Sequence, residues 1–147
     1  MDNIEFVEKL RKYKACDEAV EWVADQSLEE IWETCVRGDW LMWLVIFFHM
    51  DKKSNTIHLY ADFIKTILNY SIQPIEVLLE NINIIENKII DATHEELDQC
   101  MIDLYEIYTT ALSTILEEDK EAMYSNVANF VKQRVPVPSY SAETIYE

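Results

Sequence analysis

Residues 39–50, DWLMWLVIFFHM, form the most apolar segment of this 147-residue chain. Apolar residues occupy nearly every side of the helix that the segment would form, which is typical of a helix at the centre of a protein. The continuous apolar run, Trp40 to Phe48, is much shorter than the ~20 residues with which a helix crosses a membrane. The segment therefore predicts a buried central helix, with Asp39 as its N-cap.

Three shorter helices are predicted on the N-terminal side of this segment. The first has apolar residues at a spacing of three, Ile4, Val7 and Leu10. The second covers residues 16–24. The third begins at Ser27-Leu28-Glu29-Glu30, the pattern of a capping box, in which the serine hydroxyl accepts from a backbone amide and Glu30 reaches back. Gly38, the single glycine, is expected to end this helix in the left-handed conformation.

Further helices are predicted on the C-terminal side. They cover residues 56–69, the segment that follows Pro74, the segment that follows a second capping box at Thr93-His94-Glu95-Glu96, and residues 122–135. Residues 51–55 are expected to form a loop, and residues 117–120 either a turn or continuous helix. The positions expected to face the core are Ile57, Tyr60, Ala61, Ile64 and Leu68; Ile75, Leu78, Leu79, Ile82 and Ile89; Leu97, Met101, Leu104, Tyr108, Ala111, Leu112 and Ile115; and Met123, Val127, Phe130 and Val131.

The composition points to the same fold class. One glycine and three prolines are too few for the turns of a β-rich fold, and one glycine cannot make a phosphate-binding loop or a dinucleotide fingerprint. We expect an all-α, single-domain bundle of about six to eight helices with short loops. The bundle is expected over residues 1–135, and residues 136–147, which begin at Pro136, are expected to form an extended C-terminal tail.

The charge is strongly negative. The chain carries 28 acidic residues against 12 lysines and arginines, a formal net charge of −16. Such a protein repels nucleic acid and anionic membranes, so neither direct nucleic-acid binding nor membrane binding is expected. It attracts a basic protein partner, although acidity also serves solubility alone. The first ten residues contain no apolar secretory segment, and the three widely separated cysteines indicate free thiols in a reducing compartment, so a cytoplasmic location is expected.

No pattern in the sequence predicts catalysis. The three histidines, His49, His58 and His94, are expected on different helices without the ligand spacing of a metal site, so neither a metal nor a cofactor is expected. All three cysteines lie among apolar neighbours and are expected to be buried structural residues. Paired carboxylates are abundant only because acidic residues are abundant. The sequence therefore favours a protein that is not an enzyme.

Four tryptophans, Trp22, Trp32, Trp40 and Trp43, fall within 22 residues. Tryptophans at helical spacing are most often core residues, and Trp40 and Trp43 share a helix face. An exposed indole as a partner-binding hot spot is the alternative. A pocket with converging polar groups near these residues would indicate a small-molecule binder or an enzyme, whereas a solid core would exclude both.

An acidic helix face is the candidate binding surface. Residues 86–121 contain eleven acidic residues and two lysines. Glu95, Glu96, Asp103 and Glu106 are predicted to lie along one side of a helix, opposite its apolar residues. The face is interpreted as a docking surface for a basic protein, with a merely solvated face and a mimic of DNA phosphates as alternatives.

Several of these segments resemble one group of small helical proteins of bacteria and phages. The resemblance rests on Ala15-Cys16-Asp17-Glu18-Ala19-Val20-Glu21-Trp22, on Trp32 and Cys35, on Arg37-Gly38-Asp39-Trp40-Leu41-Met42-Trp43-Leu44 and on Asp91-Ala92-Thr93-His94-Glu95-Glu96-Leu97-Asp98. Such proteins are assigned as immunity proteins of polymorphic toxin systems. The resemblance implies an all-helical fold and a non-enzymatic inhibitor, without catalytic residues. The matched positions are expected to be structural: Cys16, Trp22, Trp32, Cys35, Gly38, Asp39, Trp40 and Trp43.

Three hypotheses about function follow. The first is an acidic immunity-type inhibitor that binds and occludes a basic protein partner. The second is a phage anti-defence protein that mimics nucleic acid. The third is a helical small-molecule binder or an enzyme of unknown reaction.

Overall fold

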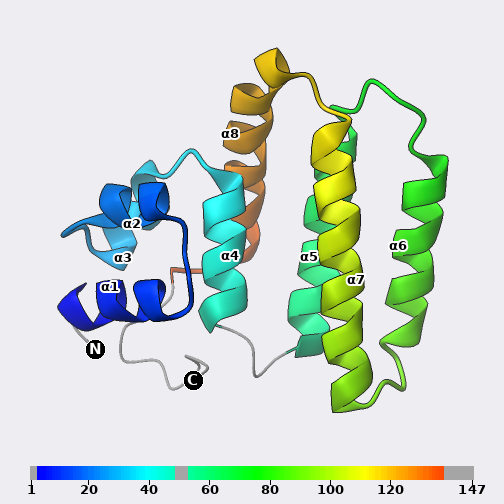
Figure 1. Cartoon of the computed structure of the whole chain (residues 1–147), viewed down its shortest axis with the longest axis horizontal. Helices are drawn as coiled ribbons and strands as arrows, with labels where there is room; N and C mark the ends of the chain where they lie inside the picture. Colours follow the sequence, from blue (N-terminus) through cyan, green and yellow to red (C-terminus); the bar gives the residue numbers. More distant parts are fainter. Residues whose placement is uncertain (1–2, 49–52, 138–147) are drawn as a thin grey trace.

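The computed structural model describes residues 3–48 and 53–137, which form eight α-helices and no strand (Figure 1). The helices are α1 (Asn3–Lys12), α2 (Asp17–Val23), α3 (Leu28–Thr34), α4 (Gly38–Phe48), α5 (Lys53–Leu68), α6 (Glu76–Lys88), α7 (His94–Ser113) and α8 (Glu117–Arg134). The predicted all-α bundle of six to eight helices is confirmed. Among the described residues, no helix is both long and apolar enough to cross a membrane.

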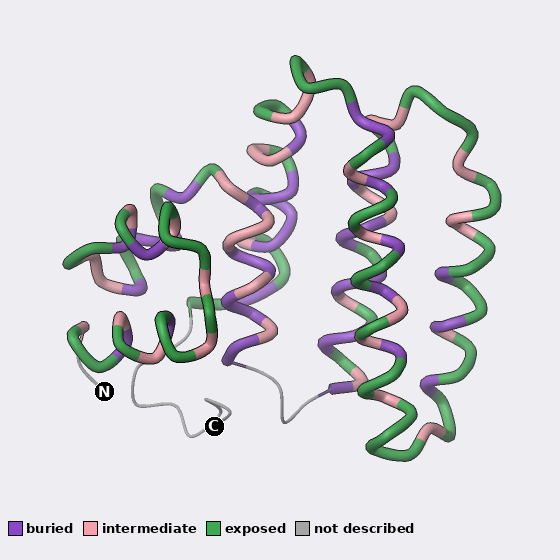
Figure 2. The backbone as a smooth tube through the Cα atoms, in the orientation of Figure 1, coloured by how far each residue is buried: buried purple, intermediate pink, exposed green. Residues whose placement is uncertain are grey.

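The helices are arranged around two closely packed pairs. α4 packs against α8, and α5 packs against α7, while α5 also contacts α4 and α8 and so joins the two pairs. α6 lies at one edge, against α5 and α7, and the short helices α1–α3 lie at the other end, beside α4 (Figure 1). In Figure 2 the outer side of α6 is mostly exposed, as expected for an edge helix.

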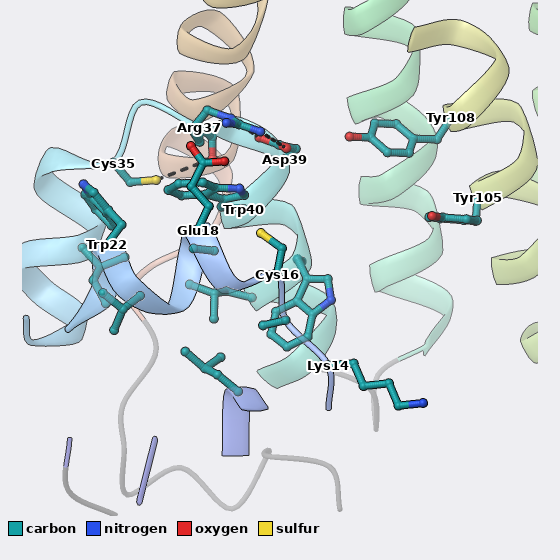
Figure 3. A pocket seen from close by; sticks show the side chains of 17 residues that line it. Lys14, Cys16, Glu18, Trp22, Cys35, Arg37, Asp39, Trp40, Tyr105 and Tyr108 are labelled. Atoms are coloured by element: carbon teal, nitrogen blue, oxygen red, sulfur yellow. Dashed lines mark hydrogen bonds and ion pairs between the residues drawn. The ribbon is translucent and has the colours of Figure 1, made fainter. Parts of the chain in front are cut away.

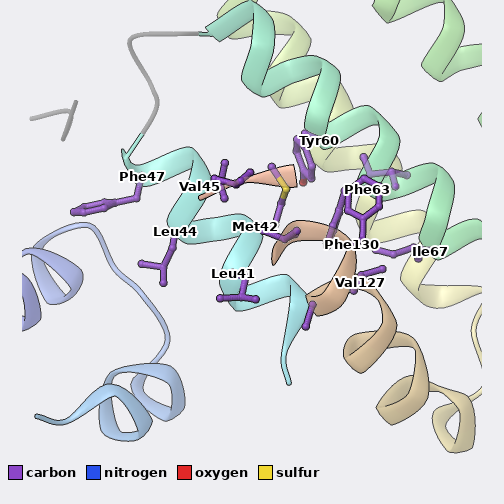
Figure 4. Packing of buried hydrophobic residues seen from close by; sticks show 14 of the residues in the cluster. Leu41, Met42, Leu44, Val45, Phe47, Tyr60, Phe63, Ile67, Val127 and Phe130 are labelled. Atoms are coloured by element: carbon purple, nitrogen blue, oxygen red, sulfur yellow. The ribbon is translucent and has the colours of Figure 1, made fainter. Parts of the chain in front are cut away.

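The prediction of a buried central helix is confirmed in α4. Leu41, Met42, Leu44, Val45, Phe47 and Phe48 are all buried. Met42 and Val45 face α5 and α8, and Phe47 lies on the side of α1 (Figure 4). Burial of each such side chain stabilises a fold by about 1.5–3 kcal/mol, so α4 makes a large contribution to the core. The last two residues of the predicted segment, His49 and Met50, lie outside the described residues.

The role predicted for Gly38 is wrong. α3 already ends at Thr34, and Gly38 is the first residue of α4, without a positive φ. A Cβ atom at Gly38 would lie 2.2 Å from Val127 Cγ2 and 2.6 Å from the Ala128 backbone nitrogen, both in α8. A glycine is needed there because the start of α4 lies directly against α8, a contact between distant parts of the chain.

The predicted cap at Asp39 is also wrong. Because α4 begins at Gly38, Asp39 lies inside its first turn. The Asp39 carboxylate accepts two hydrogen bonds from the Arg37 guanidinium, at 2.9 Å to Nε and 2.8 Å to Nη2. A carboxylate in the first turn still interacts favourably with the helix dipole, so the acidic residue stabilises α4 without capping it.

Both predicted capping motifs begin a helix at the expected residue. At α7, Glu96 N donates to Thr93 Oγ1 and Thr93 N donates to Glu96 Oε1, both at 3.2 Å, which completes the capping box. At α3, Glu30 N donates to Ser27 Oγ at 3.1 Å, and the Glu30 carboxylate accepts from the Ser27 hydroxyl at 3.2 Å. Ser27 therefore caps α3, but both hydrogen bonds involve its hydroxyl, whereas in the capping box of α7 the glutamate accepts from the backbone of the cap residue.

Other boundaries and faces differ from the prediction. α5 begins at Lys53, so residues 53–55 are helical rather than a loop. The chain leaves the helical conformation at residues 114–116, and residues 117–120 form the first turn of α8. At this break the Thr114 carbonyl accepts from Ile72 N at 3.1 Å.

The buried face of α1 also differs from the prediction. Phe6 is buried and Ile4 is 70 % exposed, because the core contact is with Phe47 and Phe48 of α4.

The buried faces of α5 and α8 agree with the predicted positions. In α7 the buried positions are Cys100, Leu104, Ile107 and Ala111. In α6 they are Ile82 and Ile85, and Ile89, the residue after the helix, is also buried. Leu97, Met101, Tyr108 and Leu112 of α7, and Ile75, Leu78 and Leu79 near the start of α6, are only half-buried. The most deeply buried side of α7 is therefore rotated relative to the predicted one, because α7 packs against α5 and α6 together.

α8 ends at Arg134, and a hydrogen bond from α3 holds the next residue, Val135. Val135 is buried, and its carbonyl accepts from Trp32 Nε1 at 3.2 Å. Pro136 and Val137 are exposed, and residues 138–147 of the predicted tail lie outside the described residues. Trp32 thus ties α3 to the end of α8.

Candidate functional site

The tryptophan cluster is not one solid core. Trp32 is buried, whereas Trp22, Trp40 and Trp43 are half-buried. The half-buried three line a cavity of about 380 Å³ that extends from α2 and the α1–α2 connection across α4 to α7 (Figure 3). Among the other matched positions, Gly38 and Cys35 are buried and Asp39 is half-buried. The structural role expected for the motif therefore describes only part of it, and we call this cavity the aromatic pocket.

Aromatic rings form both walls of the pocket. The ring centroids of Trp22 and Trp40 lie 5.8 Å apart at an angle of 50°, and Trp43 stacks on Phe47 at 5.4 Å and 14°. Tyr105 and Tyr108 of α7 form the opposite wall, with ring centroids 6.2 Å apart. Sequence reasoning placed Tyr108 in the core and did not single out Tyr105; the one local signal was their spacing of three, which puts them on one helix face.

An ion pair lies at one side of the pocket. The Arg37 guanidinium is bound by Asp39, and its carbon lies 4.6 Å from the ring centroid of Trp40 and 4.3 Å from that of Tyr124. The hydrogen bond to Asp39 raises the pKa of Arg37 against the opposing effect of burial. Arg37 is therefore a fixed cation held between two aromatic faces.

The cysteines differ from one another. Cys35 is buried and its thiol contacts the Arg37 carbonyl at 3.5 Å, and burial raises the pKa of Cys35, which keeps it a protonated thiol at neutral pH. Burial likewise raises the pKa of Cys100. Cys16, in contrast, is exposed at the rim of the pocket, so the prediction that all three cysteines are buried is wrong for Cys16. Cys16 is the N-cap residue of α2, and its side chain makes no capping hydrogen bond.

The tyrosine wall supplies polar groups. The hydroxyls of Tyr105 and Tyr108 point toward α4 in Figure 3. Burial raises the pKa of Tyr108, with a smaller contribution from the Asp39 charge, so its hydroxyl stays protonated. Within residues 3–48 and 53–137, no protein group forms a hydrogen bond with this hydroxyl or with the indole nitrogens of Trp40 and Trp43. These groups are available to a bound molecule.

The predicted acidic residues lie together along α7. Glu95, Glu96 and Glu106 are exposed and Asp103 is half-buried. Two of them have local partners: Glu96 belongs to the capping box, where the Thr93 backbone hydrogen bond lowers its pKa, and Asp103 accepts from Gln99 Nε2 at 2.9 Å. The structure brings the four onto one side of α7, and we call them the acidic stripe.

A groove runs beside the acidic stripe, between α6 and α7. Its volume is about 360 Å³, and its lining is part apolar, from Leu78, Ile84, Ile85 and Ile107, and part charged, from Lys88, Asp103 and Glu106. Ile84 is 47 % exposed. Two residues of the acidic stripe, Asp103 and Glu106, therefore line a groove of mixed apolar and polar character, which the sequence did not reveal because the groove depends on how α6 packs against α7.

His58 and His94, the two histidines of the described residues, do not belong to a metal site there. The buried side chain of Lys53 donates to His94 Nε2 at 2.8 Å and forms an ion pair with Asp98. His58 pairs with Glu86, which also binds Lys65. Over residues 3–48 and 53–137, no group of three histidine, cysteine or acidic side chains has the arrangement that holds a metal ion.

Comparison of this chain with protein-family models, with curated proteins and with solved structures finds no match in any of the three.

Proposed function

We propose that this chain is a non-enzymatic, acidic interaction protein of the immunity type, which binds a basic protein in the cytoplasm and occludes its active surface. The observation that carries the proposal is the acidic stripe beside a partly apolar groove on α6 and α7. A protein interface needs both properties, because charge speeds association and selects the partner, while buried apolar area holds the complex together.

The exposed apolar residues of α7 support this proposal. Ile102 and Tyr105 are 53 % and 59 % exposed, and they lie on the same outward side of the helix as Glu95 and Glu106. Neighbouring exposed apolar side chains rimmed by polar residues are typical of a binding site. The net charge of −16 and the resemblance of the motif segments to immunity proteins point the same way.

The pocket groups also fit a role other than catalysis. Arg37 and Asp39 neutralise each other, and Cys35 is a buried protonated thiol. A general base or a nucleophile acts through a free lone pair near its substrate, whereas Asp39 is paired with Arg37 and the Cys35 thiol donates to the Arg37 carbonyl. We therefore propose binding rather than reaction as the activity.

The proposal is tested with a variant that neutralises the acidic stripe, E95Q/E96Q/D103N/E106Q. Glutamine at position 96 keeps the capping box, and asparagine at position 103 keeps an acceptor for Gln99. The matched control, E117Q/E118Q/D119N/E121Q, removes the same charge from the start of α8. Each protein is used as bait in a host-cell lysate at low salt, and the captured protein is then purified and its association rate measured.

We expect the stripe variant to associate about tenfold more slowly, with a weaker salt dependence, and the control to change little. The captured protein should be basic and should lose its activity when bound. Recovery of no protein at low salt would contradict the proposal. So would equal association rates for the stripe variant and the wild type.

The aromatic pocket favours a second candidate function, the binding of a small molecule. Its volume of about 380 Å³ lies within the range of known ligand sites, about 300–1,000 Å³. A thermal-shift screen of common metabolites tests this function: a metabolite that raises the melting temperature of the wild type and not of Tyr105→Leu would support it.

A further inference from the structure

The aromatic pocket has the composition of a cation-binding site. The faces of aromatic rings carry negative potential and attract guanidinium and ammonium groups, most strongly at tryptophan. Three tryptophans and two tyrosines line this pocket. The chain itself shows that its rings accept a guanidinium, because Arg37 lies 4.6 Å from the Trp40 ring and 4.3 Å from the Tyr124 ring.

Two carboxylates and two basic groups line the pocket, and one of the carboxylates, Glu18, lies at the exposed rim. Asp39 is bound to Arg37, so this pair adds no net charge. Glu18 of α2 is exposed and lines the pocket, and its charge is among the smaller causes that raise the pKa of Arg37. Lys14 also lines the pocket, but its ammonium group points away from Trp22 and Trp40 in Figure 3. In a chain with a net charge of −16, this arrangement favours a cation over an anion.

The pocket can be reached from the surface that is proposed to meet the partner. Cys16 and Glu18 are exposed on one side of its rim, and Tyr105, 59 % exposed, forms the other. On α7, Ile102 lies between Tyr105 and the acidic stripe. Because a helix turns 100° per residue, Tyr105, Ile102 and Glu95 follow one another around the axis of α7. One continuous surface therefore joins the pocket to the acidic stripe.

We propose that the aromatic pocket receives an arginine side chain of the basic protein partner, with its guanidinium against the tryptophan rings and paired with Glu18. This inference rests on the proposed function and names the contact that would anchor the complex. Arginine and tryptophan are both enriched among interface residues that dominate binding energy. The planar guanidinium stacks on rings and binds a carboxylate at its edge, which the lysine ammonium does not do equally well.

The test uses N-acetyl-arginine amide as the probe and N-acetyl-citrulline amide as its uncharged isostere. Binding is followed by the indole N–H signals in ¹H–¹⁵N NMR spectra, assigned with single tryptophan-to-phenylalanine variants. We expect arginine to shift the signals of Trp22, Trp40 and Trp43 with saturation at millimolar concentration. The signal of Trp32 serves as an internal control, because this buried indole donates to Val135 and does not line the pocket.

Two exposed carboxylates of α2 provide a matched pair of variants. Glu18→Gln should weaken arginine binding about fivefold, since it removes the paired charge. Glu21→Gln, three residues on and outside the pocket lining, should leave it unchanged. Circular dichroism checks that both variants keep their helix content, which is expected because both side chains are exposed.

Three results would overturn the inference: no saturable shift with arginine, equal shifts with citrulline, or tighter binding of an anionic nucleotide such as AMP. The probe contains no protein partner, so the pocket and the proposed function can fail separately. If arginine shifts are absent while the stripe variant associates slowly, the pocket inference alone is wrong. If arginine binds through Glu18 while the stripe variant associates at the wild-type rate, the inference holds and the proposed docking surface is wrong.

Discussion

Gly38 lies directly against Val127: a Cβ atom at Gly38 would come within 2.2 Å of Val127 Cγ2. The contact brings the start of α4 onto α8, and the two helices form one of the two closely packed pairs of the bundle. Arg37 precedes this glycine and Asp39 follows it, so the same close approach positions the ion pair at the edge of the aromatic pocket. Helix packing and the geometry of the candidate site are therefore coupled at Gly38.

Gly38→Ala is expected to destabilise the protein by about 2–3 kcal/mol, because overpacking in a dense core typically costs about 1–3 kcal/mol and here the added atom also meets backbone. Urea denaturation measures the free energy of unfolding. Val127→Ala in the same chain should recover only part of the loss, since the Ala128 nitrogen, 2.6 Å from the added Cβ, cannot move aside. Wild-type stability of Gly38→Ala would contradict the close approach of α4 and α8.

Thr93→Ala is expected to destabilise the protein by about 1 kcal/mol, because it removes the side-chain acceptor at the start of α7. Thr93→Ser keeps the hydroxyl and is the control. In the same variants, the carboxyl of Glu96 can be titrated by NMR. The Thr93 hydrogen bonds hold the pKa of Glu96 below its ordinary value of 4.5, so Thr93→Ala should raise it. A Glu96 titration midpoint in the wild type that is not below the ordinary value of 4.5 would show that the box does not form in solution.

The pairing of Asp98 with Lys53 predicts a dependence of stability on pH. The hydrogen bond from Lys53 holds the pKa of Asp98 below its ordinary value of 3.8, against a smaller opposing effect of burial. A depressed pKa adds stability above the ordinary value, and this stability is lost as the pH falls through the lowered pKa. Asp98→Asn should therefore be less stable than the wild type at pH 6, and the difference should disappear near pH 2.

The comparison with Asp98→Asn is needed because protonation of the many other acidic groups also relieves repulsion in this chain. Urea denaturation of both proteins at several pH values between 2 and 6 gives the difference directly. A difference that stayed constant over this range would contradict the ion pair.

The three thiols should react with 5,5′-dithiobis-(2-nitrobenzoic acid) at very different rates. Cys16 is exposed and is expected to account for one fast phase at pH 8. Cys35 and Cys100 are buried, and burial raises the pKa of both, so they should react only as the protein opens. Cys16→Ser should abolish the fast phase, and two fast thiols in the wild type would contradict the burial of Cys35 or Cys100.

Most of the secondary structure could be derived from the amino-acid order alone. The apolar run of α4, the apolar spacing of α5 and α8, and the capping residues Ser27 and Thr93 are local patterns. Each acts within a few residues along the chain, through helix periodicity or through hydrogen bonds to the first turn. With one glycine and three prolines, little in the composition favours any fold other than a helical bundle.

The candidate site, in contrast, arises from contacts between residues far apart in the chain. Trp40 and Trp43 belong to a helix face that sequence reasoning assigned to the core, and they become pocket walls because Tyr105 and Tyr108 of α7 stand across from them. Glycine is the residue type that most often ends a helix, but Gly38 begins α4 and is a packing contact, because α8 lies directly against it. Periodicity tells which residues share a face, but which face meets which neighbour depends on long-range packing, and that packing exists only once the helices have assembled.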